Sequence, residues 1–304
     1  FAGLATGFLN SWRTTPNATA LIHDGCSWTY DEILDEARRW AAALRRSHNS
    51  ASRQVVGILA DRGTTEHTAK LAALLAGCIF VPLNPKFPVA RLAEMINRAG
   101  VSTLITDSDA AALVPAIVDA VPTEISVLLT DTKGKALRHQ IGSVVTDVVD
   151  LAAADPLPLE TVAEPDMTDA AYIMFTSGSS GQPKGVPITH GNLRAFVAGA
   201  VERHNFCPTD VFALTFDSTF DLSIFGPFVA WEVGAAAATM SVADLSDPAG
   251  FLAQNAVTVW LSVPSVAKAA HAAGRLTPDA FPSLRFSFFC GEALSRRTAV
   301  AWQT

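Results

Sequence analysis

The sequence has few charged side chains and no excess of positive charge. Charged residues make up 17% of the 304 positions and hydrophobic residues 49%, whereas about 25% charged residues is typical of soluble domains. This composition excludes an intrinsically disordered chain. The 22 basic and 29 acidic residues give a net charge of -7, which argues against sequence-independent binding of nucleic acid or of an anionic membrane. We therefore expect no nucleic-acid partner and expect any nucleotide to be bound locally.

Cysteine pairs and long apolar runs are also lacking. The four cysteines, Cys26, Cys78, Cys207 and Cys290, form no CxxC pair and lie beside no histidine cluster, which excludes a disulfide framework and a structural zinc site. The longest uncharged apolar run, residues 71–83, contains Pro82 and is shorter than the roughly 20 residues of a membrane span. Residues 1–10 resemble no signal peptide. These features predict a cytoplasmic protein with reduced thiols and no membrane partner.

The first half of the chain alternates strand and helix patterns. Thr29 to Glu32 has the spacing of a capping box and opens a helix whose apolar residues lie on one face. A further helix over 65–75 should stop near Gly77, and another runs from Pro88 to Gly100. Strands are predicted at 55–59, 79–81 (ended by Pro82), 103–105 and 125–129. This alternation predicts an α/β fold with doubly wound, mostly parallel sheets.

A second alternating series follows a segment rich in Ala, Pro and acidic residues at 150–169, which predicts a linker or surface crossover. Strands are predicted at 171–175, 211–216, 257–261 and 284–289, and helices at 192–201, at 222–231 and from about Ser295. We therefore expect two α/β subdomains, residues 1–155 and 165–304. Because the chain stops within a helical pattern, we expect the second to be incomplete.

The most informative stretch is residues 172–186, where a buried strand leads into a loop of small and hydroxylated residues followed by a lysine. Its backbone N–H groups, hydroxyls and lysine suit a polyphosphate. The candidate phosphate ligands are Thr176, Ser177, Gly178, Ser179, Ser180, Gly181 and Lys184. The loop is not a Walker A motif, because Pro183 precedes the lysine and no GK[ST] runs into a helix. The segment should instead return as an extended hairpin; the alternative is a flexible surface turn without a ligand.

The order Thr-Ser-Gly-Ser-Ser-Gly-x-Pro-Lys-Gly at 176–185 resembles the phosphate-loop signature of the adenylate-forming superfamily, which contains acyl-CoA synthetases, luciferases and amino-acid adenylation domains. Residues 71–91 keep the AG…VPL.P..P..R skeleton of the adenylation domains, 220–223 resemble their FDxS motif, and 289–294 their GEAL motif. The combination is most similar to ligases of the D-alanine:D-alanyl carrier protein type. The resemblance implies the N-terminal core of such an enzyme, with its mobile C-terminal lobe absent.

The resemblance also implies an amino-acid pocket. Asp221 would pair with the substrate's α-ammonium, and a buried carboxylate of this kind would reject acids that lack a cation. Asp221 could alternatively cap the following helix, the reading that we favour for Asp217. Pocket residues implied by the resemblance are Leu222, Phe225, Leu261, Phe288 and Cys290, with the backbone at Gly291 and Glu292 along the adenine. Cys290 would contact a small side chain, or would be an inert core thiol. We assign no role to His190.

No Ser/His/Asp or Cys/His constellation is apparent, so we predict no catalytic residue and no protein-bound metal in this chain. The resemblance implies that the substrate carboxylate attacks the α-phosphate of ATP, with Mg²⁺ bridging phosphate oxygens, and that the acyl group then passes to the phosphopantetheine thiol of a carrier protein. It implies a free-standing ligase or a nonribosomal peptide synthetase module of antibiotic biosynthesis.

Alanine is the first expected substrate, with serine, proline and glycine behind it and the D or L configuration open. The residues that hold Mg²⁺ and ribose, and the catalytic lysine, would lie after residue 304, so this chain alone should adenylate weakly. One alternative is an acyl- or aryl-CoA ligase, which Asp221 disfavours because its substrate offers no cation. A non-catalytic nucleotide-binding module is another. A P-loop kinase is disfavoured by the missing GK[ST].

Overall fold

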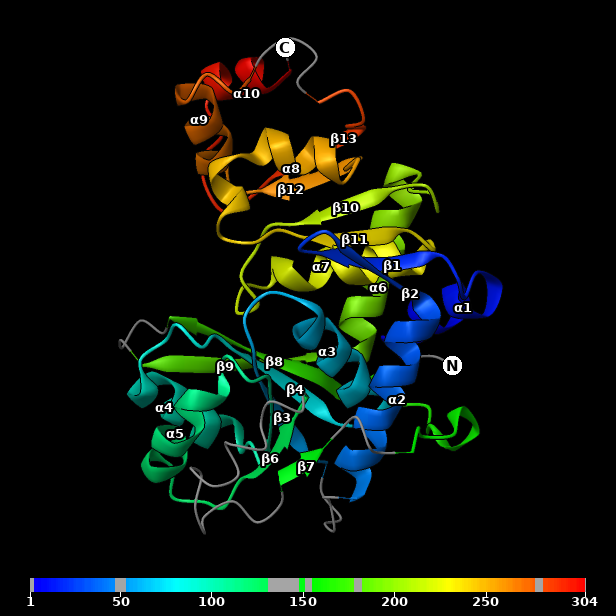
Figure 1. Ribbon diagram of the computed structural model, residues 1–304, viewed down its shortest axis with the longest axis vertical. Helices are drawn as coiled ribbons and strands as arrows, with labels where there is room; N and C mark the ends of the chain where they lie inside the picture. The colour runs from blue at the N-terminus through cyan, green and yellow to red at the C-terminus, as the bar shows by residue number, and fades with distance from the viewer. Residues whose placement is uncertain are drawn as a thin grey trace. The chain divides into compact units, whose positions relative to one another are not determined.

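The computed structural model describes residues 3–46, 53–130, 148–150, 155–177, 182–276 and 281–303. The chain forms two compact units, each with its own sheet (Figure 1). Unit 1 comprises Phe1–Thr6, Asp31–Gly199 and Ser218–Asp221, and unit 2 comprises Gly7–Tyr30, Ala200–Asp217 and Leu222–Thr304. The α/β class with mostly parallel sheets, expected from the sequence, is confirmed.

Unit 1 contains a seven-stranded sheet of order β7-β6-β5-β3-β4-β8-β9, in which only the β8–β9 pair is antiparallel among the described strands. Its strands are β3 (Val55–Leu59), β4 (Ile79–Leu83), β5 (Thr103–Thr106), β6 (Ser126–Leu129), β7 (Val148–Asp150), β8 (Ala170–Ser177) and β9 (Pro183–Thr189). Its main helices are α2 (Tyr30–Arg46), α3 (Thr64–Ala76), α4 (Val89–Ala99), α5 (Val114–Ala120) and the first part of α6 (His190–His204).

Both faces of this sheet are covered, as a doubly wound fold requires. On β3, Leu59 packs into a core cluster with residues of α4 and α5, while Val56 and Ile58, of opposite parity, are also buried. Successive strand side chains point to opposite faces, so burial at both parities shows that neither face meets solvent. Gly77 and Gly100 adopt the left-handed conformation that ends α3 and α4, as predicted.

The predicted end of β4 at Pro82 is wrong. The strand continues to Leu83, and Pro82 lies opposite Ile58 of β3. Proline removes one N–H donor but its fixed φ is compatible with an extended backbone, so it is tolerated close to the end of a strand.

Unit 2 contains a six-stranded sheet of order β13-β12-β10-β11-β1-β2. Its strands are β1 (Thr19–His23), β2 (Cys26–Thr29), β10 (Val211–Leu214), β11 (Ala236–Thr239), β12 (Val259–Ser262) and β13 (Phe286–Phe289). Its helices of seven or more residues are α1 (Thr6–Thr14), α7 (Leu222–Glu232), α8 (Pro248–Gln254), α9 (Pro264–Ala272) and α10 (Arg296–Gln303) within the described ranges. The strands are parallel except for the β1–β2 hairpin.

Two elements of this sheet were not predicted. The β1–β2 hairpin turns at Asp24 and Gly25, both with positive φ, and an Asp-Gly pair is itself a hairpin signal. Strand β11 consists largely of alanine, which has low strand propensity. It forms because β10 and β1 pair with it from both sides and bury it completely.

The units do not divide the chain at one point. The division expected from composition, 1–155 and 165–304, assigns β8 and β9 to the second subdomain, whereas in the structure these strands extend the sheet of unit 1. The pairing of Phe80 on β4 with Tyr172 on β8 joins them. In the described part of the chain no helix is both long and apolar enough to cross a membrane.

Candidate functional site

The predicted phosphate loop joins two antiparallel strands of unit 1. Thr176 lies opposite Lys184, and Ser177 lies opposite Pro183. The expected extended hairpin is therefore confirmed. The four predicted ligands at the turn, Gly178, Ser179, Ser180 and Gly181, lie outside the described residues.

At the described base of the hairpin, the side chains of Thr176 and Lys184 are exposed, and the Thr176 hydroxyl donates to the Lys184 carbonyl at 3.5 Å. Gly185 has a packing role, because a Cβ there would lie 3.0 Å from Cγ2 of Ile173. Thr176 and Lys184 therefore lie exposed at the ends of β8 and β9 that lead into the loop.

Asp221 lies near β8 within unit 1. The ring of Tyr172 is buried and stacks on Phe80, with centroids 5.3 Å apart. Burial, and secondarily the negative charge of Asp221, raise the pKa of Tyr172 to about 12. The phenol is therefore neutral at neutral pH and adds no second negative charge near Asp221.

Asp221 is exposed and directly precedes α7. This is the position of an N-cap residue, and its exposure is compatible with both helix capping and ligand binding. Asp217 lies too far before α7 to be its N-cap, and the predicted capping role of Asp217 is wrong.

The side chains predicted to line the amino-acid pocket come from three elements of unit 2. Leu222 and Phe225 lie on α7, Leu261 on β12 and Phe288 on β13. The register places Leu261 opposite Phe288, and the rings of Phe225 and Phe288 meet edge to face at 6.5 Å. The structure therefore brings Phe225, Leu261 and Phe288 together.

Leu222 and Cys290 differ from these three residues in their exposure. Leu222 is half-buried at the start of α7. Cys290 follows β13, its N–H donates to the Ser262 carbonyl at 3.1 Å, and its side chain is exposed. The alternative reading of Cys290 as an inert core thiol is wrong, because the thiol reaches the surface.

Sequence reasoning missed a second layer of rings behind Phe288. The ring of His204, in the last turn of α6, meets Phe288 edge to face at 4.9 Å. Phe206 contacts the same ring at 6.3 Å, and Phe286 stacks on it at 6.1 Å. Alternation along β13 predicts that Phe286 and Phe288 share a face, but no sequence signal connects this face with His204.

A buried carboxylate fixes the strand that carries Phe288. Asp210 accepts hydrogen bonds from the Cys207 N–H at 2.8 Å, from the Thr258 hydroxyl at 2.6 Å and from Nη1 of Arg285 at 2.6 Å. Burial would raise the pKa of Asp210, but these hydrogen bonds and the charge of Arg285 together lower it. Asp210, Thr258 and Arg285, which lie just before β10, β12 and β13, are therefore held together by hydrogen bonds to one carboxylate.

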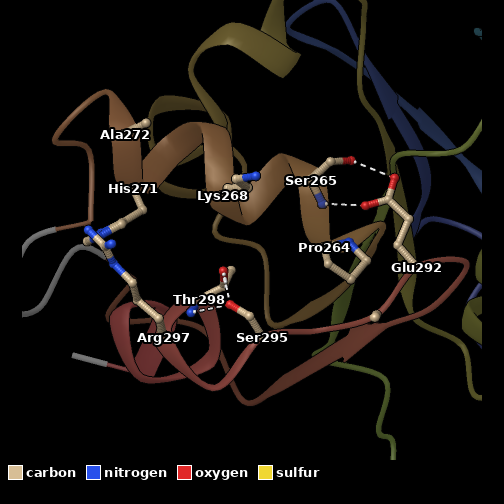
Figure 2. Close-up of a pocket in the computed structure, with 10 residues that line it drawn as sticks. Pro264, Ser265, Lys268, His271, Ala272, Glu292, Ser295, Arg297 and Thr298 are labelled. Atoms are coloured by element: carbon tan, nitrogen blue, oxygen red, sulfur yellow. Dashed lines mark hydrogen bonds between the residues drawn. The ribbon is translucent and has the colours of Figure 1, made fainter.

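The predicted adenine-proximal turn borders a surface pocket of about 630 Å³. Gly291 has a φ of 86°, a conformation that favours glycine. The next residue, Glu292, accepts hydrogen bonds from the N–H and the hydroxyl of Ser265 at 3.1 and 3.0 Å (Figure 2). Glu292 therefore holds the turn against the start of α9, and the turn itself is exposed.

His190 has a structural environment. It is buried, and its Nδ1 accepts the backbone N–H of Leu4 at 3.1 Å. Burial, followed by the charge of Arg53, lowers the pKa of His190 and favours the neutral ring that this hydrogen bond requires. Among the residues that the structure describes, no group of three or more His, Cys, Asp or Glu side chains is arranged to hold a metal ion.

Residues 8–304 match the family model of AMP-binding enzymes. The chain belongs to this adenylate-forming family. It is 34% identical over 273 residues to an L-proline--[L-prolyl-carrier protein] ligase of Streptomyces coelicolor, a match that covers 87% of this chain and 49% of the relative. It is 30% identical over 288 residues to the enzyme of the same name from Pseudomonas fluorescens, covering 93% and 55%. The chain thus spans about half the length of these curated relatives.

Solved structures agree with this assignment. The Vibrio cholerae adenylation domain AlmE in complex with glycyl-adenosine-5'-phosphate has a TM-score of 0.90 at 26% identity, covering 100% of this chain and 57% of that one. The crystal structure of IdnL7 has a TM-score of 0.86 at 32% identity, covering 99% and 58%. The relatives include the hybrid PKS-NRPS synthetase pyvA of Aspergillus violaceofuscus, which is 32% identical over 296 residues, covering 95% of this chain and 7% of the relative. The resemblance found in the sequence motifs is confirmed at the level of the family and its fold.

Proposed function

We propose that this chain is the nucleotide- and amino-acid-binding core of a ligase. The ligase activates a small apolar amino acid as its adenylate, releases pyrophosphate, and passes the acyl group to the phosphopantetheine thiol of a carrier protein. Membership of the AMP-binding family supports the adenylation step. Relatives named as L-prolyl-carrier protein ligases support an amino acid as the substrate and a carrier protein as the acceptor.

The single observation that carries the proposed substrate class is the cluster of Phe225, Leu261 and Phe288. Two rings meet edge to face, and a leucine lies opposite one of them. The Phe288 ring is backed by His204 at 4.9 Å, so it has little room to retreat from a larger substrate. Such a lining favours a small apolar side chain. Alanine and proline are the leading candidates, and serine and glycine follow.

Asp221 supplies the proposed selection for an amino acid. Its carboxylate would pair with the α-ammonium of a bound amino acid, an interaction that an acid without a cation cannot make. The neutral phenol of Tyr172 beside it does not compete for the ammonium. This pairing would orient the substrate carboxylate toward the α-phosphate.

Thr176 and Lys184, with the loop between them, would hold the β- and γ-phosphates of ATP. Their exposed side chains at the base of the β8–β9 hairpin fit this role. Mg²⁺ bound with the nucleotide would reduce the negative charge that the attacking carboxylate meets. The turn at Gly291 and Glu292 would lie along the adenine. The proposed C-terminal lobe would complete the active site.

The test is hydroxylamine-trapped, ATP-dependent activation by the full-length protein. The panel contains D- and L-alanine, L-proline, serine, glycine, benzoate and a fatty acid. We expect a signal with one small amino acid and none with the last two acids. Activity only with benzoate or the fatty acid would move the protein to the CoA-ligase branch and would leave Asp221 as a helix cap.

Two variants test the assigned residues. Asp221→Asn should abolish amino-acid turnover while ATP affinity is retained, and Asp119→Asn, at an exposed site on α5, is the matched control. Lys184→Ala should slow pyrophosphate release. Parent-like turnover by Asp221→Asn would contradict the assignment of Asp221 to the amino-acid pocket. An unchanged rate of pyrophosphate release by Lys184→Ala would contradict the assignment of the β8–β9 hairpin as the phosphate site.

A further inference from the structure

The pocket beside Glu292 collects basic side chains from two helices of unit 2. Lys268 and His271 lie three residues apart on α9, a spacing that puts them on one face. Arg297 comes from α10 and lines the same pocket (Figure 2). These side chains line one concave surface although the whole chain has a net charge of -7.

No ion pair joins Lys268, His271 or Arg297 to another residue in the described part of the chain. The lining contains one carboxylate, Glu292, and both of its oxygens accept hydrogen bonds from Ser265 at the start of α9. The positive charges of Lys268 and Arg297 repel one another, and a bound anion would offset this repulsion.

The rest of the lining suits an anion that has an organic part. The hydroxyls of Ser295 and Thr298 share a hydrogen bond of 2.8 Å at the start of α10. Pro264, Ala272 and Ala293 add apolar surface. The volume of about 630 Å³ falls within the roughly 300–1,000 Å³ of small-molecule sites.

We propose that this pocket binds a phosphate monoester. Such a group carries close to two negative charges at neutral pH and offers several acceptor oxygens. The planar fork of Arg297 and the ammonium of Lys268 are the groups that proteins use for such oxygens. The site differs from the proposed ATP phosphate site, because the latter is built from residues of the β8–β9 hairpin in unit 1. Glu292 borders both this pocket and the proposed adenine position, so the two sites are neighbours and the experiment must separate them.

The experiment is isothermal titration calorimetry of the full-length protein at low ionic strength. The probes are inorganic phosphate, glycerol 3-phosphate and pantetheine 4′-phosphate, which separate a free phosphate, a simple phosphate monoester and a pantetheine derivative as sources of the same group; AMP is not used, because the proposed ATP site would also bind it. The Lys268→Ala/Arg297→Ala double variant removes two exposed side chains, so it should keep the fold and the melting temperature. We expect at least about a tenfold loss of affinity for the probe that binds, as befits the loss of charge-assisted hydrogen bonds.

Lys184→Ala separates this pocket from the ATP site. It should leave the affinity of the pocket ligand unchanged, and Arg297→Lys should restore part of the affinity that Arg297→Ala loses. Absence of binding by all three probes would overturn the proposal. So would equal affinities of the parent and the double variant, or a loss confined to Lys184→Ala.

Discussion

Replacing the buried carboxylate of Asp210 tests whether one hydrogen-bonded charge fixes the strands that carry the proposed amino-acid pocket. Asp210 is 1% exposed. Asp210→Asn keeps one oxygen, which can still accept from Thr258 and Arg285. Its other group becomes an NH₂ that faces the N–H of Cys207, the partner of Oδ2 in the parent. Two donors then oppose each other, and the negative charge is lost.

The expected cost follows from these partners. A hydrogen bond to a charged group contributes about 1.5–3 kcal/mol, and an unsatisfied buried donor costs about 1–3 kcal/mol. The Arg285 side chain is 40% exposed, so water can replace part of its interaction. We expect Asp210→Asn to lower the free energy of unfolding by about 2 kcal/mol, because mainly the Cys207 N–H loses its acceptor. Asp210→Ala removes the acceptor of all three donors and should lower the free energy of unfolding by about 3–4 kcal/mol.

The stabilisation by Asp210 should depend on pH in one direction. Its pKa is lowered from the ordinary value of 3.8. A carboxyl group whose folded-state pKa lies below its unfolded-state pKa contributes fully above the unfolded value, and this contribution is lost as the pH falls through the folded value. The difference between parent and Asp210→Asn should therefore be constant near neutral pH and shrink below about pH 4.

Urea unfolding followed by tryptophan fluorescence at several pH values measures both effects. Asp119→Asn, at an exposed carboxylate, is the control and should change the free energy of unfolding by less than about 0.5 kcal/mol. The reasoning is refuted if Asp210→Asn also stays within about 0.5 kcal/mol of the parent at pH 7. A full difference that persists to pH 3 would refute the pH argument.

Two further predictions concern packing and thiol reactivity. Gly226→Ala places a Cβ 2.3 Å from Cδ2 of Leu214 and should cost about 1–3 kcal/mol, whereas Gly199→Ala, with no atom within 4 Å, should stabilise α6 by about 0.5–1 kcal/mol. Thermal melting compares them, and equal effects of the two substitutions would contradict the packing argument. Burial raises the pKa of the Cys78 thiol to about 12, so iodoacetamide at pH 8 should label the exposed Cys26 and spare Cys78 until the chain is unfolded. Peptide mapping by mass spectrometry reads this out, and labelling of both at one rate would show that Cys78 is accessible.

The elements that the sequence predicts well are those whose signal is local. Strand β3 is a short apolar run, and α3 and α4 end at glycines whose left-handed conformation follows from the missing Cβ. The proline after the phosphate loop predicts an extended return strand, and the antiparallel pairing of Thr176 with Lys184 confirms it. In each case the residues near the element determine its conformation.

The features that the sequence does not reveal depend on distant partners. The alanines of β11 form a strand only because β10 and β1 flank them. The position of His204 behind Phe288 depends on the end of α6 meeting β13. The basic pocket depends on residues of α9 and α10 meeting beside Glu292, although Lys268 and Glu292 are 24 residues apart in the sequence. Such convergence is set by tertiary packing, and local periodicity carries no information about it.

The register of β13 shows how the packing of unit 2 and the position of Phe288 depend on each other. Phe288 faces the rings of His204 and Phe206. The adjacent residues lie on the opposite face of the strand: the Ser287 hydroxyl accepts a hydrogen bond from Nε1 of Trp302 at 2.8 Å, and Phe289 packs edge to face on the same indole at 5.4 Å. A slip of one residue would exchange the two faces. It would remove Phe288 from Leu261 and at the same time break the contacts of Trp302. Because Arg285, immediately before β13, is tied to Asp210, the hydrogen bonds that stabilise unit 2 also determine which side chain of β13 faces the proposed amino-acid pocket.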